Sequence, residues 1–436
     1  MINYDIIKLL NLESLDIDPS YSHIEKESNG DFILYIELTK KNNYICPCCS
    51  CQTNKIHDYR SKKIIHGLYL DRKLRIDYKF RRLICLNCNK IFSEDNPFSK
   101  SKDYISEYTK RMIIFKLKDF HSTYSSVAND YHVSVHSVMN IFDEYITCTR
   151  RSLDEYVSFD EFYLGSKHKN KYAFIIYNPI KDEIIDVVPC RHKNYLIKYF
   201  LENYSYEERS KVKFVSIDMY LPYKQVIKKV FQNPIIAVDS FHVIEHLTKA
   251  MDDFRIKTMS SFSTNTDKLI NNDIIYYFLK KFHYFFTKDF DKIYSGDIKV
   301  PKIKSKMKKD QILKFLLSID KNLTEAYELK EQYRFFNTHT IERTLLVEGR
   351  IESFAHKFRS TPNELFQEFG NTILNWIDEI CNSFVYLNGK RLSNGPIESV
   401  NSRIKIILKN ACGVTSFNRL RNRIMYSLNK NQPLTK

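Results

Sequence analysis

The sequence lacks several features that would assign it to common classes of protein. It contains no run of eighteen apolar residues, so we expect no membrane-spanning helix. Its first residues are acidic and precede no apolar run, unlike a secretory signal peptide. Neither an internal repeat nor a low-complexity tract occurs, and no Ser-His-Asp or Cys-His arrangement stands out. The chain nevertheless has 436 residues and 43% hydrophobic content, which is enough for roughly two to four globular domains.

Acidic residues are fewer than basic ones, and the imbalance is localised. The chain carries 68 Lys and Arg against 52 Asp and Glu, a net charge of +16. Residues 51–100 hold twelve basic and five acidic side chains, whereas residues 1–50 hold four and eight; eight basic residues and no acidic one follow Glu398. The chain is also rich in Lys, Asn, Ile and Tyr, as an AT-rich genome would impose, but that bias does not explain the localisation. The distribution therefore indicates a nucleic-acid partner.

Six of the ten cysteines fall in two short segments. The pairs Cys46-x-x-Cys49 and Cys85-x-x-Cys88 have the spacing that tetrahedral zinc requires, with each sulfur about 2.3 Å from the metal. Without an export signal, such clustering favours metal thiolates in a reducing cytoplasm over disulfides. Cys48-x-x-Cys51 has the same spacing, so spacing alone leaves the register of the first pair open. His57 and His66 could substitute, although single histidines are more often surface or core residues. We expect one structural zinc ion.

The first 150 residues contain two local patterns. Residues 1–100 are typical of a short helix, a hairpin around Asn29-Gly30 and a cysteine-bearing β module. From about 103 to 150, two short helices separated by the bend "YHVS" predict a helix-turn-helix, although such pairs also occur as packing units. The side chains expected to face inward are Val127 and Ala128 on the first helix and Val135, Val138, Met139 and Phe142 on the second.

Residues 156–240 alternate between strands and helices. We expect strands near 156–162, 172–178, 184–190, 212–217 and 235–239, and helices near 193–203 and 221–231. This is an RNase H-like order, a mixed sheet covered by helices. Residues 241–385 are strongly helical apart from a lysine-heavy break at 287–311, in which residues 299–309 could contact DNA or form a mobile loop. The predicted fold is a multidomain α+β protein with an RNase H-like core and a mostly helical insertion.

Three acidic residues stand where their carboxylates could meet at one edge of the sheet. Asp160 ends the apolar run of "YVSFDEF", Asp218 ends "VKFVSID", and Glu398 lies in a loop entering a helix. Magnesium takes hard oxygen ligands of this kind, and two such ions can clamp the attacking and leaving oxygens of a phosphodiester. Each acid could instead form a turn or cap a helix. Because neighbouring side chains on a strand point to opposite faces, only one of Asp160 and Glu161 can join such a site.

Asp239 and His242, in "VDSFHVIEHL", are accessory candidates for the same site. The alternative is that Asp239 or Ser240 caps the next helix. A place near the site is reasonable because the strand before Asp239 would neighbour that of Asp218.

Basic and polar side chains in three segments are candidate DNA contacts, with a solvated surface as the alternative. Zinc would hold the basic strands against DNA, the second helix of the helix-turn-helix would read bases, and the helix after Glu398 would follow phosphates. The candidates are Arg72, Lys73, Arg75, Lys79, Arg81 and Arg82; His136, Ser137 and Asn140; and Arg403, Lys405 and Lys409, followed by Arg419, Arg421 and Arg423.

Several blocks of the sequence together resemble the DDE transposases of bacterial insertion sequences, specifically the ISL3 family. They are "CPCC", "CLNC", "FDEFYLGS", "VSIDMYLPYKQVIKK", "AVDSFHVIEHL" and "SNGPIESVNSRIKIILKNACGVTSFNRLRNRI", of which the last is the most distinctive. The resemblance implies that Asp160, rather than Glu161, forms a catalytic triad with Asp218 and Glu398 on two Mg²⁺ or Mn²⁺ ions. It also favours Cys46 and Cys49 as zinc ligands, because the family has proline after the first cysteine.

The resemblance further implies a domain order and a function. The expected domains are a zinc-binding domain at 1–100, a helix-turn-helix at 101–150, the first part of the catalytic core at 151–245, a helical insertion at 246–385 and the last part of the core at 386–436. The expected function is a cytoplasmic transposase that binds double-stranded DNA at the terminal repeats of its element, cuts there and joins the ends to target DNA, at least as a dimer. The alternatives are a non-catalytic DNA-binding regulator and a nuclease of the RNase H fold that does not transfer strands.

Overall fold

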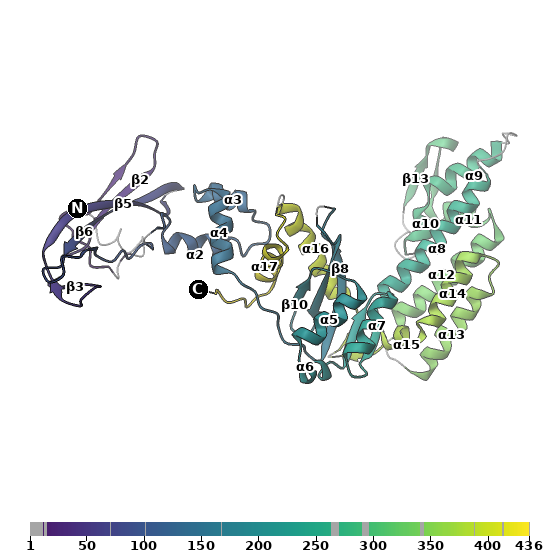
Figure 1. Ribbon diagram of the computed structural model, residues 1–436. Coiled ribbons are helices and arrows are strands. Elements are labelled where there is room, and N and C mark those ends of the chain that lie inside the picture. The colour runs from purple at the N-terminus through teal and green to yellow at the C-terminus, as the bar shows by residue number, and fades with distance from the viewer. Residues whose placement is uncertain are drawn as a thin grey trace. The chain divides into compact units, whose positions relative to one another are not determined.

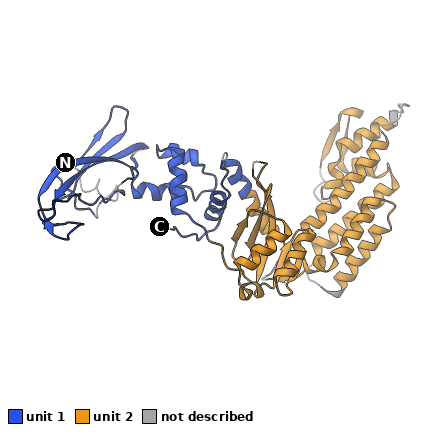
Figure 2. Cartoon of the chain, in the orientation of Figure 1, with its two compact units in different colours: residues 1–148, 404–436 blue, residues 149–403 orange. Residues whose placement is uncertain are grey.

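The computed structural model describes residues 12, 15–69, 71–100, 102–166, 168–262, 270–289, 296–340, 344–387, 389–411 and 414–435. The chain divides into two compact units (Figure 2). One comprises residues 1–148 and 404–436, and the other residues 149–403. No helix within the described ranges is both long enough and apolar enough to cross a membrane. The division into five domains stays a prediction. Residues 404–436, however, belong to the same compact unit as the N-terminal residues 1–148.

The N-terminal part of the chain is a β-rich module. Its sheet has the order β1–β2–β6–β5, with β7 paired to β6. The hairpin predicted around Gly30 is observed, and Gly30 has φ +87°, a left-handed conformation that suits a residue without Cβ. The short helix expected near the start falls outside the described residues. The strands are β1 (His23–Lys26), β2 (Phe32–Glu37), β3 (Tyr44–Ile45), β4 (Gln52–Thr53), β5 (Ile56–Tyr69), β6 (Arg72–Ile84) and β7 (Ile91–Ser93).

Three helices follow the sheet, and the two predicted around the "YHVS" bend are present. They are α2 (Glu107–Lys116), α3 (Tyr124–Asp130) and α4 (Val135–Tyr145). Hydroxyl groups of Ser106, Thr123 and Ser134 cap their N-termini. Val127, Ala128, Val138 and Phe142 are buried as expected, and Met139 is half-buried. The expectation for Val135 was wrong: as the first residue of α4 it is 38% exposed, because the first turn projects beyond the packed part of the helix.

The C-terminal helix α17 (Phe417–Leu428) packs on these three helices. The Tyr426 hydroxyl donates to the carbonyl of Ile114 at 3.0 Å. Arg423 is 4% exposed and donates to the carbonyls of Asp119 and Ser122 at 3.0 and 2.9 Å. These buried contacts explain why residues 404–436 belong to the N-terminal unit.

The second unit contains a five-stranded mixed sheet of order β10–β9–β8–β11–β12 (Figure 1). β8, β9 and β10 are antiparallel neighbours, whereas β11 runs parallel to both β8 and β12. The order and directions are consistent with the RNase H-like core predicted from the sequence. The elements are β8 (Tyr156–Tyr163), β9 (Tyr172–Asn178), β10 (Glu183–Val188), α5 (Lys193–Asn203), α6 (Tyr206–Ser210), β11 (Phe214–Ile217), α7 (Leu221–Val230) and β12 (Ile235–Val238).

A helical part follows β12 and shares one hydrophobic core with the sheet. The lysine-heavy break contains a two-stranded hairpin rather than only a loop. The elements are α8 (Ser240–Ser261), α9 (Ile270–Lys281), α10 (Tyr284–Thr287), β13 (Asp297–Val300), the 3-10 helix η2 (Pro301–Ile303), β14 (Ser305–Lys308), α11 (Lys309–Leu317), α12 (Lys321–His339), α13 (Leu345–Arg359), α14 (Glu364–Asn375), α15 (Ile377–Asn382), β15 (Tyr386–Leu387), β16 (Lys390–Arg391) and α16 (Gly395–Asn410).

Candidate active site and metal centres

Three neighbouring parallel strands bring acidic residues to one edge of the mixed sheet. The register that pairs Ser158 with Ser216 puts Asp160 level with Asp218, two residues further along both strands. The register of β11 and β12 puts Asp218 level with Asp239 in the same way. Asp160 and Asp239 are almost completely buried, at 9% and 1% exposure. Three carboxylates therefore lie level with one another, Asp160 inside β8 and Asp218 and Asp239 just beyond the carboxyl ends of β11 and β12.

Glu161 points away from this cluster, as the alternation of strand side chains predicts. Its carboxylate forms an ion pair with Arg191 and accepts a hydrogen bond from the Tyr223 hydroxyl. Glu161 therefore stabilises the opposite face of β8, and Asp160 is the acid that joins the cluster.

The helix α16 supplies further side chains to the cluster from far along the chain. Asn394, Glu398 and Asn401 follow one another at helical spacings of four and three residues, which places them on one face. The Asn394 amide donates to Asp218 Oδ1 at 3.1 Å, and the Asn401 amide donates to Asp160 Oδ2 at 2.5 Å. Glu398, whose side chain is 40% exposed, lies between these two contacts in sequence. The segment 394–401 is thus hydrogen-bonded to both Asp160 and Asp218. Glu398 lies near Asp218 through His242, which is 3.2 Å from Asp218 and 4.0 Å from Glu398, and the metal-binding group that includes Glu398 is completed by Asp239 and His242.

His242 lies among the acidic groups. Its Nδ1 atom is 3.2 Å from Asp218 Oδ1, 3.4 Å from Asp239 Oδ2 and 4.0 Å from Glu398 Oε1. Burial lowers the pKa of His242, but the hydrogen bond to Asp239 and the nearby negative charges outweigh that effect and raise it to about 9. At neutral pH the ring is therefore an imidazolium that donates to carboxylates. A cation that bound to His242 would have to displace one of its protons.

Asp239 combines the two roles considered for it. It caps α8 by accepting a hydrogen bond from the backbone N–H of Phe241 at 3.3 Å. Its other carboxylate oxygen faces His242, and the ligand atoms of Asp239, His242 and Glu398 lie within 4.8 Å of one another. Asp239 and His242 therefore belong to the cluster geometrically, and their chemical role remains a proposal.

Burial and mutual repulsion shift the carboxylate pKa values upward. Desolvation, followed by the charge of Asp218, raises the pKa of Asp160 to about 7. Desolvation also raises the pKa of Asp218 to about 6, against the opposing effects of His242 and Asn394. The pKa of Glu398 is raised by burial and by Asp239. Such a group of destabilised carboxylates is typical of a site that binds a cation.

The residues fit hydrated magnesium. In addition to the carboxylates, the amide oxygens of Asn394 and Asn401 are buried and have no hydrogen-bond partner among the described residues. The amide nitrogen of Asn394 donates to the Phe159 carbonyl and to Asp218 Oδ1. The amide nitrogen of Asn401 donates to Asp160 Oδ2 and to the Glu161 carbonyl. Because all four partners are acceptors, the orientation of both amides is fixed. An unpaired buried acceptor is costly, and the waters that Mg²⁺ usually retains are suitable donors.

We expect magnesium binding to weaken as the pH falls. Asp160 and Asp218, with pKa values of about 7 and 6, are ionised at about pH 8 and must lose protons to bind a cation at lower pH. The Mg²⁺ concentration that gives half of the maximal thermal stabilisation should rise at least about tenfold between about pH 8 and pH 6. Asp160→Asn should bind Mg²⁺ more weakly and lose most of this pH dependence. Identical titrations of the wild-type protein at both pH values would contradict the expectation.

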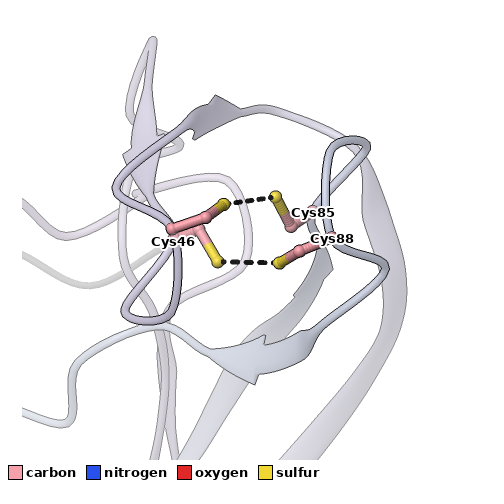
Figure 3. A group of neighbouring side chains, drawn as sticks. Cys46, Cys85 and Cys88 are labelled. Atoms are coloured by element: carbon pink, nitrogen blue, oxygen red, sulfur yellow. Dashed lines mark hydrogen bonds between the residues drawn. The ribbon is translucent and has the colours of Figure 1, made fainter.

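The N-terminal unit contains a second candidate metal centre, formed by four cysteines (Figure 3). The sulfur atoms of Cys46 and Cys88 are 3.6 Å apart, and those of Cys49 and Cys85 are 3.5 Å apart. Four sulfurs placed tetrahedrally at about 2.3 Å from one zinc ion would be about 3.8 Å apart, so the cluster fits zinc. The first pair is Cys46 and Cys49, as the family pattern favoured, and not Cys48 and Cys51.

The two cysteine loops have the same backbone geometry. The N–H of Ser50 donates to the carbonyl of Cys46, and the N–H of Asn89 donates to that of Cys85, both at 2.9 Å. Ser50 and Asn89 have φ values of 58° and 56°. Repeated turns of this form bring the two sulfurs of each pair to the same side. The candidate ligand His66 instead lies in the core and faces the Ser106 hydroxyl at 3.1 Å.

The basic residues proposed on β6 are largely paired with acids. Arg75 pairs with Glu27, Lys79 with Glu37 at 2.9 Å, and Arg82 with Asp58 at 3.0 Å. Arg81 departs from the expectation of a DNA contact. It is 3% exposed and pairs with Glu37 and Glu94 at 2.7 and 3.2 Å, so it holds the sheet together. Arg72 is exposed and Lys73 half-exposed.

The remaining DNA-contact candidates differ in exposure. On α4, His136 and Asn140 are exposed and Ser137 is half-buried. On α16, Lys405 and Lys409 are exposed and Arg403 is half-buried. On α17, Arg423 is buried and cannot follow phosphates as expected, because it binds backbone carbonyls inside its own unit. Arg419 and Arg421 are half-buried; Arg419 pairs with Asp143 at 3.0 Å, and Arg421 donates to the carbonyl of Cys148 at 2.6 Å.

Asn394 was expected only as part of the turn that presents Glu398, and Asn401 only as part of the polar surface after it; neither was predicted to hold an aspartate. Their spacing from Glu398 on a helix beginning at Gly395-Pro396 was a usable signal, because it places three polar side chains on one face. What the spacing could not indicate was the direction of that face.

Carboxylates at one edge of a mixed sheet, in a fold consistent with an RNase H-like core, suit a metal-dependent phosphoryl-transfer enzyme. A family model described as a transposase, of the DDE type and the ISL3 group, matches residues 157–424. The chain therefore belongs to the ISL3 family of DDE transposases, enzymes of DNA transposition. No curated protein matches the chain.

Proposed function

We propose that this protein binds the terminal inverted repeats of its own insertion sequence, cuts the DNA there and transfers the ends to target DNA. What supports the proposal is that Asp160 and Asp218 stand level on neighbouring strands and are both hydrogen-bonded to the segment that carries Glu398, although the three acids come from distant parts of the chain. Neither a regulator without catalysis nor a structural protein needs three desolvated carboxylates whose pKa values are raised.

Asp160, Asp218 and Glu398 would bind two magnesium or manganese ions. When bound, the ions supply Lewis acidity at the attacking and leaving oxygens of the phosphodiester. Asn394 and Asn401 hold the two aspartate carboxylates in place through their amide nitrogens, and they offer buried amide oxygens to neighbouring waters. The half-exposed Glu398 is the member of the group that DNA can approach most directly.

His242 and Asp239 would support the same site. The imidazolium of His242 balances part of the negative charge of Asp218, Asp239 and Glu398 before a cation binds. Asp239 fixes the orientation of the ring by accepting a hydrogen bond from its Nδ1–H group. We therefore assign both residues positioning roles rather than direct contact with the reacting phosphate.

The N-terminal unit would recognise the ends of the element. One structural zinc ion on Cys46, Cys49, Cys85 and Cys88 would hold the β module that presents the basic strand β6. The second helix, α4, would contribute base contacts, and the exposed end of α16 would contribute phosphate contacts. The proposed contact residues are Arg72, Lys73, Arg75, Lys79, Arg82, His136, Ser137, Asn140, Arg403, Lys405 and Lys409. Because two ends are processed together, we expect at least a dimer on DNA.

The test is incubation of the full-length protein with labelled element ends, a target duplex and Mg²⁺. We expect nicked ends and joined products, and neither product when EDTA replaces Mg²⁺, because the carboxylates alone provide no electrophile. Binding without a nick in Mg²⁺ or Mn²⁺ would favour a DNA-binding regulator. Nicked ends that never join a target would favour a nuclease that does not transfer strands.

A further inference from the structure

The hairpin of β13 and β14 has one apolar face and one basic face. Ile298, Val300 and Met307 pack against the hydrophobic core of the helical part, and Val300 is completely buried. Figure 1 shows β13 beside the helices of this part, and β14 contacts α11. Because side chains alternate along a strand, the residues between these apolar ones point to solvent. The hairpin is therefore a fixed surface element.

The solvent face of the hairpin carries an unfavourable charge arrangement. Lys299 stands directly opposite Lys306 in the antiparallel register, and like charges in that position are destabilising. Lys304 lies in the turn just before β14. All three side chains are exposed, and within the described part of the chain none forms an ion pair with a carboxylate, whereas Lys302 pairs with Asp273 and Lys308 stands opposite Asp297. Of residues 299–309, six are lysine and none is acidic.

Other lysines of the helical part are arranged differently. Lys257 pairs with Glu364 at 3.9 Å, and Lys321 pairs with Glu325 at 3.7 Å, although their side chains are 73% and 89% exposed. The general abundance of lysine therefore does not explain the pairing of Lys299 with Lys306 across the hairpin. A polyanion on this surface would relieve the repulsion.

We propose that Lys299, Lys304 and Lys306 bind the phosphate backbone of duplex DNA during transposition. This inference rests on the proposed function, because it assumes that DNA is the substrate. Lysine ammonium groups act as flexible point charges that suit phosphates. No arginine, asparagine or glutamine lies between residues 297 and 310, so the hairpin lacks the side chains whose rigid planar groups are best suited to reading base edges. The contact is therefore independent of DNA sequence.

The test compares the full-length protein with the triple variant Lys299→Gln/Lys304→Gln/Lys306→Gln on a terminal-repeat duplex and on a duplex of unrelated sequence. Each lost phosphate contact reduces the slope of log K against log[salt] by about 0.9. We expect the slope to fall by about 2 to 3 on both duplexes, with an unchanged ratio of the two affinities. The control Lys257→Gln/Lys321→Gln, which removes two lysines paired with acids, should leave the slope unchanged.

A second variant separates DNA binding from folding. Lys306→Glu replaces the repulsion with an attractive pair to Lys299, so its thermal midpoint should equal or exceed that of the wild-type protein while its DNA affinity falls. A salt slope of the triple variant within about 0.5 of the wild-type value would overturn the inference. That result, together with wild-type strand transfer, would leave the proposed function intact. Absence of cleavage by the wild-type protein would instead count against the proposed function, whatever the salt slope.

Discussion

Asp160→Asn and Asp218→Asn should each abolish strand cleavage while the protein still binds the ends of its element. The loss should be about a thousandfold or more, because a metal-assisted displacement depends on the ions for several kcal/mol of transition-state stabilisation, and ~4 kcal/mol corresponds to about 10³ in rate. Glu398→Gln should act in the same direction. The measurement is the rate of nicking of a labelled end at saturating protein and Mg²⁺.

The same two aspartate variants should be more stable than the wild-type protein without metal. Folding raises the pKa of Asp160 to about 7 and that of Asp218 to about 6, so the ionised forms are disfavoured in the folded state. The resulting loss of folding stability is fully present above about pH 7. It disappears as the pH falls toward about 4, the pKa of an aspartate in the unfolded chain. At about pH 8 we expect a gain on the order of 1–3 kcal/mol in the free energy of unfolding, measured by denaturant titration in EDTA.

Two features of the molecule provide controls. An asparagine at position 160 or 218 still has a side-chain oxygen that can accept the hydrogen bond donated by Asn401 or Asn394. The two substitutions therefore preserve the local structure. Glu202→Gln changes a 61% exposed acid on α5 that pairs only weakly with Lys198 at 3.7 Å, and both activity and stability should remain unchanged. Full cleavage by Asp218→Asn would remove this residue from the catalytic assignment.

Replacement of Cys85 and Cys88 by serine should eliminate zinc and specific end binding together. The four sulfurs already lie at distances suitable for one ion, and structural zinc contributes about 10–16 kcal/mol in small domains whose folding depends on it. We expect one zinc ion per wild-type chain, none in the double variant, and at least about a hundredfold weaker binding to the terminal repeat. Metal content is measured by elemental analysis, and binding by a mobility-shift titration.

The neighbouring cysteines provide a matched comparison. Cys48→Ser/Cys51→Ser alters the same loop but leaves the four clustered sulfurs in place, so zinc content and end binding should match the wild-type protein. Loss of zinc in this variant would show that the other register is used. Freshly purified wild-type protein without zinc would contradict the metal assignment for the whole module.

Local patterns predicted the elements of the sheet closely. The strands expected near 156–162, 172–178 and 235–239 correspond to β8, β9 and β12, and the helices expected near 193–203 and 221–231 correspond to α5 and α7. These elements are short and strongly apolar, and turn or cap residues bound them, so neighbouring residues decide where they begin and end. The hairpin at Asn29-Gly30 was predictable for the same reason.

The partners of charged side chains were not predictable in this way. Arg81 and Arg423 are basic residues in basic segments, yet both are buried and bound to groups distant in the sequence. The hydrogen bonds from Asn394 to Asp218 and from Asn401 to Asp160 likewise join residues more than 170 positions apart. Composition indicates how much charge a segment carries but not whether that charge meets an acid, a carbonyl group or solvent.

The sequence by itself determined the family, the strands and helices of the catalytic sheet, and which acids and cysteines were candidates for metal binding. Only the tertiary structure decided that the parallel register of β8, β11 and β12 sets three aspartates level and that α16 returns to them with Glu398. The physical reason is that cap residues and apolar periodicity act over a few positions of the chain, whereas strand register and helix docking depend on how the whole core packs.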